Sequence, residues 1–326
     1  MRVRRLLLFL IVAGPGCFTD SEGSRALDPD AARDLRRKLA ESQAARPTDR
    51  GFTPTAPDRF TIDLFDQRES FRRNLAAAAE STGEMQLRVW NGHPSNERYV
   101  TALFGRGGGR CSGILVSPNT ILTAAHCICE FRKDGVKPDG IRVAFRQNPS
   151  PEALGELIRV TQADREVVCP FGFNEADIVL LRLERSAKES PKRLADAPTM
   201  TALTKRAVVR VVGYGLTEAG RFAGRREADV IVASPTCSAS DAAYFGCLEG
   251  QELVARNVNE ERDACSGDSG GALLLEDPAG SGKFELVGVV SRPVLRGAVC
   301  GDGGVYGRVD DSLRQRVHAF QVARAR

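Results

Sequence analysis

Short runs of apolar and β-branched residues, separated by Gly, Pro and polar residues, recur along residues 89–326. Runs of this length and composition are typical of β-strands, because helices need longer amphipathic patterns. The pattern predicts strands at Tyr99–Phe104, Gly113–Val116, Thr120–Ala124, Ile141–Phe145, Leu157–Gln162, Ile178–Leu183, Ala207–Tyr214, Val230–Ala233, Gly271–Leu275, Leu286–Ser291 and Gly304–Val309. We therefore expect residues 89–326 to form one all-β domain.

The C-terminal stretch has a helical pattern instead. From Asp310 to Arg326, the apolar residues Leu313, Val317 and Phe320 recur at a spacing that brings them near one face of a helix. A helix that closes the β domain is therefore expected there.

Residues 18–88 differ in composition from residues 89–326, with many charges and no cysteine. Helical patterns at about 28–45 and 63–81 flank a Pro- and Thr-rich linker at 46–57. We interpret the segment as a partly helical pro-segment, or as a tether. A poorly ordered spacer is the alternative.

Residues 1–17 have the pattern of an export signal. Three arginines precede the apolar run 6–13, which is too short to span a bilayer stably. A small residue directly before Cys17 resembles a bacterial lipoprotein signal, in which the cysteine is lipidated, although Gly14 departs from that pattern. Ordinary signal-peptidase cleavage is the alternative, and the sequence leaves both open.

Length and charge restrict the function classes. The chain has 326 residues and a net charge of +4, which is too small to imply binding to nucleic acid or to a membrane surface. Membrane attachment is expected only through lipidated Cys17. We expect no cofactor and no metal, because acid–base chemistry and disulfides are better uses for the His126-Cys127-Ile128-Cys129 cluster.

Three segments carry the candidate chemistry. Ser269 stands inside Gly267-Asp268-Ser269-Gly270-Gly271, where the glycines allow a tight turn that approaches a substrate carbonyl. His126 follows Thr123-Ala124-Ala125, and Asp177 stands at the mouth of an apolar strand. Taken singly, the three residues also fit a turn serine, a core histidine and a strand-end cap.

Few histidines compete for the role of a base. The chain has only three, and His93 lies in a Gly-His-Pro turn while His318 lies on the polar C-terminal helix. His126 is therefore the candidate general base.

The segments in the order His126, Asp177, Ser269 resemble the trypsin/chymotrypsin family of serine endopeptidases. The resemblance implies two packed six-stranded antiparallel β-barrels, with Ser269 as nucleophile, His126 as general base and Asp177 orienting the imidazole. It also implies that the backbone N–H groups of Gly267 and Ser269 form the oxyanion hole. An esterase-like activity fits less well than peptide hydrolysis.

The junction between Arg88 and Val89 resembles the family's activation site, a basic residue followed by Ile or Val. Cleavage there would free an ammonium on Val89 that could fold inward and pair with the carboxylate of Asp268. Trp90 and Asn91 depart from the small residues usual in the family. The alternative is an ordinary strand start.

The resemblance also implies a specificity pocket. Asp263 stands six residues before the serine, where trypsin-like members carry the carboxylate that attracts Arg or Lys, and Ser291 and Gly304 match other pocket positions. Arg292 replaces an aromatic residue, so we expect its charge to favour acidic residues upstream of the cut. Pro293 lacks the N–H that would pair with an extended substrate.

Nine cysteines are present, and setting Cys17 aside leaves an even number in an exported protein, where disulfides form. Spacing alone does not select a pairing. The family resemblance implies Cys111–Cys127 beside the histidine, Cys265–Cys300 beside the pocket and Cys237–Cys247 as a short-loop bridge. Cys129–Cys169 then remains, without a family counterpart.

These inferences together predict a secreted, periplasmic or envelope-anchored serine endopeptidase, expected to be monomeric. Its expected partners are protein or peptide substrates and a protein protease inhibitor. The alternative is a catalytically impaired homologue that acts as a binding or adhesion module at the cell surface, for which Trp90 and Pro293 are the best support.

Overall fold

The computed structural model describes residues 92–105, 110–149, 157–169, 171–216, 224–257, 262–294 and 300–323. The signal at 1–17, the segment 18–88, Cys17 and the Arg88–Val89 junction lie outside the described residues. Among the described residues, no helix is long and apolar enough to cross a membrane.

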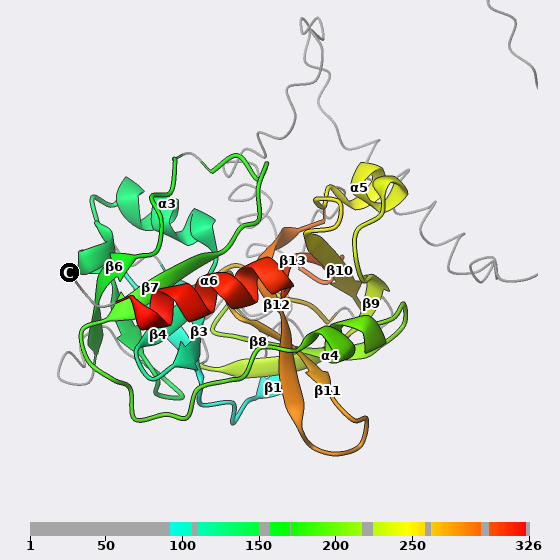
Figure 1. Cartoon of the computed structure of the whole chain (residues 1–326), viewed down its shortest axis with the longest axis horizontal. Coiled ribbons are helices and arrows are strands. Elements are labelled where there is room, and N and C mark those ends of the chain that lie inside the picture. The colour runs from blue at the N-terminus through cyan, green and yellow to red at the C-terminus, as the bar shows by residue number, and fades with distance from the viewer. Residues whose placement is uncertain are drawn as a thin grey trace, which may run out of the picture. The chain divides into compact units, whose positions relative to one another are not determined.

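Six antiparallel strands close the first barrel, which lies on the left in Figure 1. Its neighbours follow the order β2-β3-β4-β7-β6-β5, and the pairing of β2 with β5 completes the ring. The strands are β2 (Val100–Phe104), β3 (Arg110–Ser117), β4 (Thr120–Thr123), β5 (Arg142–Ala144), β6 (Ile158–Ala163) and β7 (Val179–Leu183).

The second barrel is formed by the later strands, in the order β9-β10-β13-β12-β11-β8. Pairing of β8 with β9 closes it, and β1 (His93–Pro94) is added at the edge of β9. The strands are β8 (Val208–Gly213), β9 (Arg226–Ser234), β10 (Glu252–Arg256), β11 (Ala272–Glu276), β12 (Phe284–Pro293) and β13 (Gly304–Arg308). The expected fold class of two six-stranded barrels is confirmed.

Strand-forming residues fill both barrels, because a closed barrel must bury one face of every strand. Leu103, Ile114 and Ile121 are fully buried in the first barrel, and Val211, Leu253 and Leu273 in the second. Gly113 permits close packing, since a Cβ there would lie 2.6 Å from Ile121 Cγ2. The core therefore fixes the ends of the strands that carry the candidate residues.

The closing helix is confirmed. Helix α6 (Asp311–Val322) buries Leu313, Val317 and Phe320, and it crosses in front of strands of both barrels in Figure 1. The side chain of Asp310 caps its first turn by accepting the N–H of Leu313 at 2.7 Å.

The sequence pattern did not predict several strands and helices of the structure. The sequence pattern missed β10, because only Leu253, Val254 and Ala255 form its apolar run between charged ends, and it missed the first half of β9, which begins Arg-Glu-Ala-Asp. It also missed the short helices, which a β-rich background obscures. They are α3 (Ala125–Lys133), the 3₁₀ turn η1 (Pro138–Gly140), α4 (Ala197–Ala202) and α5 (Ala239–Phe245).

Candidate active site

His126 and Asp177 are in direct contact. His126 Nδ1 lies 2.6 Å from Asp177 Oδ2, and the backbone N–H of His126 donates to Asp177 Oδ1 at 2.8 Å. The hydroxyl of Ser291 donates to the same Oδ2 at 2.7 Å. The carboxylate is fully buried and His126 is 7% exposed, so three donors hold the carboxylate in one orientation.

Local structure explains this contact. Strand β4 ends at Thr123, and α3 begins at Ala125, so His126 lies in the first turn of a short helix. Backbone N–H groups in a first turn have no partner within the helix. The carboxylate of Asp177, two residues before β7 begins, accepts one of them.

Burial and charge act in opposite directions on this pair. Burial is the largest single influence and by itself lowers the pKa of His126, but the charge and hydrogen bond of Asp177 raise that pKa above its usual value. Burial by itself raises the pKa of Asp177, whereas His126 and the hydroxyl of Ser291 bring that pKa below its ordinary range. Asp177 therefore stabilises the imidazolium form of His126 relative to a buried histidine without a carboxylate partner.

Ser269 lies beside the residue that follows the histidine. Its carbonyl oxygen lies 3.7 Å from Cys127 Sγ and accepts the N–H of Ser112 at 2.8 Å. The next residue, Gly270, has a φ of +83°, and a Cβ there would overlap the backbone of β3. No hydrogen bond joins Ser269 Oγ to His126 in the part of the chain that the structure describes.

The turn around Ser269 is held by a residue that sequence reasoning missed. The hydroxyl of Ser112 donates to the carbonyl of Gly267 at 2.9 Å and accepts the N–H of Tyr214 at 2.9 Å. Gly267 has a φ of +95°, a conformation that favours glycine. Ser112 sits in β3 with no motif around it, so only the fold reveals its contact.

Asp268 is a buried carboxylate without a cationic partner in the described part of the chain. Its oxygens accept the N–H groups of Gly215 at 2.6 Å and Cys265 at 2.8 Å. Burial raises its pKa to about 7, against the pull of these donors. A Cβ on Gly213 or Gly215 would overlap the carboxylate, so both glycines are needed where it sits.

Asp263 is a second buried carboxylate. It is 2% exposed and accepts the N–H groups of Ala264 at 2.7 Å and Gly303 at 2.9 Å. Burial raises its pKa to about 7. Strand β13 begins with Gly304 directly after this contact, and its partner strand β12 carries Ser291. The three pocket candidates thus lie on adjoining segments.

The expectation for Arg292 was wrong. Its guanidinium is buried, with the side chain 2% exposed, and it forms two hydrogen bonds with Glu252, at 2.6 and 2.7 Å. It also donates to the hydroxyl of Ser291 at 3.1 Å and to the carbonyl of Gly246 at 2.8 Å. Its charge is neutralised inside the protein and is not presented to a substrate.

Two further residues near the site carried no sequence signal. Glu252 opens the strand that the pattern missed. Phe173 has a φ of +50°, which is rare for an aromatic residue. The ring centroid of Phe173 lies 5.7 Å from the ring centroid of His126. The guanidinium of Arg292 lies over the ring of Phe173, 4.9 Å from its centroid. The ring therefore packs against both the candidate base and the buried cation.

Disulfides join the pairs that the resemblance and the remaining cysteines implied. Their Cα atoms lie 5.2–6.3 Å apart, within the range usual for this bond. The pairs are Cys111–Cys127, Cys129–Cys169, Cys237–Cys247 and Cys265–Cys300. Among the described residues, no group of three or more His, Cys, Asp or Glu side chains could hold a metal ion.

The chain is similar to one protein family and to several known proteins. The family model described as Trypsin matches residues 89–315. Coagulation factor XII of Cavia porcellus is 30% identical over 261 residues, which cover 73% of this chain and 40% of that protein. The chain thus spans less than half the length of this relative.

Two relatives are matched over most of their length. A trypsin of Saccharopolyspora erythraea is 28% identical over 65% of this chain and 88% of its own. Glucanase inhibitor protein 1 of Phytophthora infestans is 28% identical over 73% of this chain and 90% of its own. The first of these two relatives is thus named as a protease and the second as an inhibitor.

Proposed function

Because the chain belongs to the trypsin family, we propose that it is a serine endopeptidase that hydrolyses peptide bonds through Ser269, His126 and Asp177. The observation that carries the proposal is the buried contact between His126 Nδ1 and Asp177 Oδ2 at 2.6 Å. It leaves the other ring nitrogen, Nε2, to accept a proton, as a general base requires.

Each residue then has one role in acyl transfer. Ser269 Oγ attacks the carbonyl carbon of the substrate while His126 Nε2 takes its proton, and the same proton later passes to the leaving amine. Asp177 holds the imidazole tautomer and stabilises the imidazolium. The N–H groups of Gly267 and Ser269 hold the oxyanion, and the φ of +95° at Gly267 is consistent with this turn.

Cleavage after Arg or Lys is supported by Asp263. A carboxylate that is 2% exposed, with a pKa raised to about 7, has no cation to compensate it among the described residues. A guanidinium or ammonium of the substrate would supply that cation through charge-assisted hydrogen bonds. Ser291 is buried and Gly304 has no side chain, and they lie on the adjoining strands β12 and β13. Both fit the role of pocket-lining residues.

Activation by cleavage between Arg88 and Val89 is supported by Asp268. Its buried carboxylate accepts two N–H groups and pairs with no cation in the described chain. The freed ammonium of Val89 would complete this site. Because Asp268 lies beside Ser269, the pair would hold the oxyanion turn in its working shape.

Residues 1–17 act in this proposal as the export signal, residues 18–88 as the pro-segment and residues 89–326 as the protease domain. Disulfides of the kind present here form in oxidising compartments, which supports export.

The experiment that tests the function is hydrolysis of Arg- and Lys-ended peptide amides, before and after cleavage at Arg88–Val89. We expect activity to appear on cleavage and to fall by a factor of at least about 10⁴ in Ser269→Ala. Asp263→Ser should keep the triad but lose the preference for Arg and Lys. A folded, cleaved and inactive protein would instead favour a binding module, as the name of the glucanase inhibitor relative suggests for that protein.

A further inference from the structure

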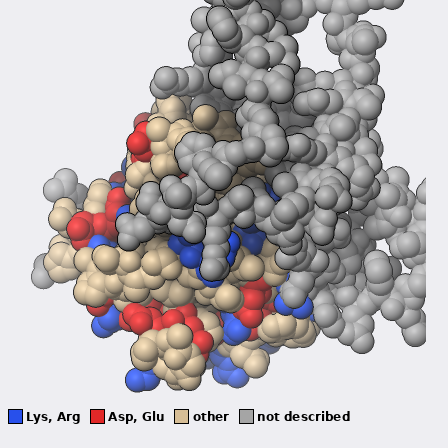
Figure 2. Space-filling view, turned by 90° about the vertical axis from the view of Figure 1, so that its right-hand side faces the viewer, with Lys and Arg blue, Asp and Glu red and all other residues tan. Residues whose placement is uncertain are grey.

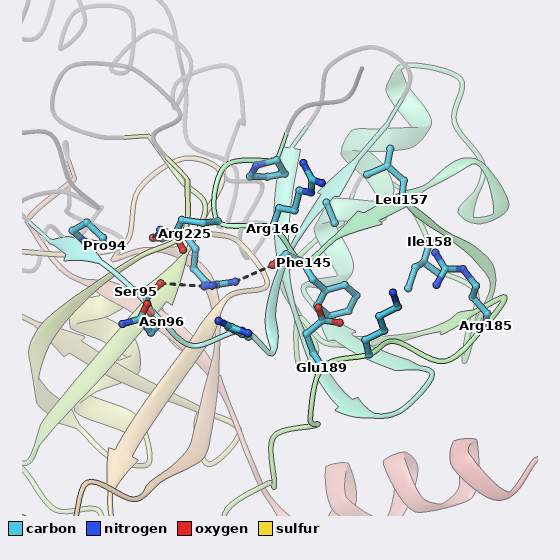
Figure 3. A pocket seen from close by; sticks show the side chains of 15 residues that line it. Pro94, Ser95, Asn96, Phe145, Arg146, Leu157, Ile158, Arg185, Glu189 and Arg225 are labelled. Atoms are coloured by element: carbon cyan, nitrogen blue, oxygen red, sulfur yellow. Dashed lines mark hydrogen bonds between the residues drawn. The ribbon is translucent and has the colours of Figure 1, made fainter. Parts of the chain in front are cut away.

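A second surface of the protein has the features of a binding site. It is a groove of about 650 Å³ that none of the proposed catalytic residues lines. Its walls come from the end of β1 with the segment after it (94–98), from the end of β5 with the segment after it (144–149), from the start of β6 and from the loop after β7 (185–189). Arg225, just before β9, lines it as well. We call it the junction groove, because both barrels contribute to it (Figure 3).

We propose that the junction groove binds an acidic segment of a partner polypeptide, in which Asp or Glu residues alternate with apolar ones. Three observations on the described residues carry this proposal: a buried uncompensated cation, unpaired cations on the rim, and apolar side chains that line the same groove. The proposal does not depend on the proposed catalytic activity.

The buried cation is Arg225, which is 3% exposed. Its guanidinium donates to the carbonyl oxygens of Ser95 at 3.4 Å and Phe145 at 3.2 Å, on either side of it in Figure 3, and to the hydroxyl of Tyr214 at 3.0 Å. These acceptors are neutral. Since a fully buried arginine normally pairs with a carboxylate, its charge remains to attract an anion.

The rim adds further positive charge. Arg98, Arg185 and Lys188 line the groove with exposed side chains and have no carboxylate partner among the described residues. Arg146 lines it as well. Glu189 is the carboxylate among the described lining residues, so cations outnumber it. A hollow lined mainly by one sign of charge concentrates the field and attracts ligands of the opposite sign.

This imbalance is local. Over the whole chain the net charge is only +4, and on the face in Figure 2 basic and acidic side chains lie in separate small groups. The excess of cations in the groove therefore does not follow from a strongly basic chain.

Apolar side chains decide the class of anion. Pro94, Phe145, Pro149 and Leu157 line the same groove as the cations. A sulfated glycan would use the cations but leave this apolar surface exposed to water. A polypeptide with apolar residues between its carboxylates would cover the apolar side chains of the groove and pair its carboxylates with the cations.

The test is binding of a fluorescent peptide that alternates Asp with Leu, measured by anisotropy with the full-length protein carrying Ser269→Ala. The matched control peptide has Asn in place of Asp. Test variants replace the rim cations, in Arg98→Gln/Arg185→Gln/Lys188→Gln. Arg225 stays, because its loss would also disturb Tyr214. A protein control loses the same net charge elsewhere, in Lys137→Gln/Lys205→Gln/Lys283→Gln.

We expect the Asp peptide to bind, its affinity to fall with salt, and the rim variant to bind about tenfold more weakly, with less than about a twofold change in the control variant. Equal binding of the Asn peptide, equal losses in the two variants, or no binding would each overturn the proposal. Binding of heparin without binding of the Asp peptide would also overturn it, since the groove would then select a glycan.

Discussion

Replacing Asp268 with Asn is expected to change how the stability of the uncut chain depends on pH. The carboxylate is fully buried, its partners among the described residues are the N–H groups of Gly215 and Cys265, and its pKa is about 7 instead of 3.8. With a raised pKa, the folded state holds the proton more tightly than the unfolded state does. The stabilising contribution is therefore full below about pH 4 and is lost as the pH rises through about 7.

The magnitude follows from the two pKa values. As the pH rises from about 5 to about 8, the contribution of Asp268 protonation to the free energy of unfolding should fall by about 2.5 kcal/mol. Asn cannot ionise, so Asp268→Asn removes this loss. Its amide N–H₂ faces one of the two backbone N–H groups, which costs about 1–3 kcal/mol at every pH. The variant should thus be less stable near pH 5 and should approach or exceed the parent near pH 8.

The assay is urea unfolding followed by circular dichroism at both pH values, with disulfides intact and Ser269→Ala present to prevent self-cleavage. Asp263→Asn is the matched control, because Asp263 is equally buried with the same pKa of about 7. Cleavage at Arg88–Val89 should abolish the pH dependence due to Asp268 and leave that of Asp263. If Asp268→Asn left the pH dependence of the uncut chain unchanged, the carboxylate would already have a cationic partner, and the reasoning would be refuted.

Three more predictions concern the site and its supports. Glu252→Gln leaves the cation of Arg292 buried and unpaired, so it should lower the free energy of unfolding by about 3–5 kcal/mol. Replacing both residues with Met should restore most of this loss, and equal losses for the two variants in urea unfolding would contradict the reasoning. The acid limb of the pH profile of kcat/KM should lie above the usual histidine value of about 6.5, because the raised pKa keeps His126 protonated to higher pH; a limb below it would show that burial dominates. Replacing Cys129 and Cys169 with Ala opens a bridge over 40 residues and should cost about 2–4 kcal/mol in thermal unfolding, with no change in Tm as the contrary result.

Local features of the chain were enough to predict an all-β domain and the candidate residues. Strand runs interrupted by Gly and Pro are local features, and they predict a β domain without knowledge of pairing. The motifs around His126, Asp177 and Ser269 are also local, so their order along the chain was enough to indicate the family. The apolar spacing that predicted the C-terminal helix belongs to the same class of signal.

Which distant groups come into contact depends on the three-dimensional arrangement of the strands. The charge of Arg292 was expected to face the substrate, but Glu252 lies 40 residues earlier, on β10, and neutralises it. Strand β13 lies between β10 and β12 in the sheet. Likewise, Ser112 reaches Gly267 over a separation of 155 residues. Such contacts depend on barrel closure and strand register, which residue patterns do not encode pair by pair. The burial of Asp268 and Arg225 without an opposite charge among the described residues has the same cause, since burial belongs to the fold and not to the residue.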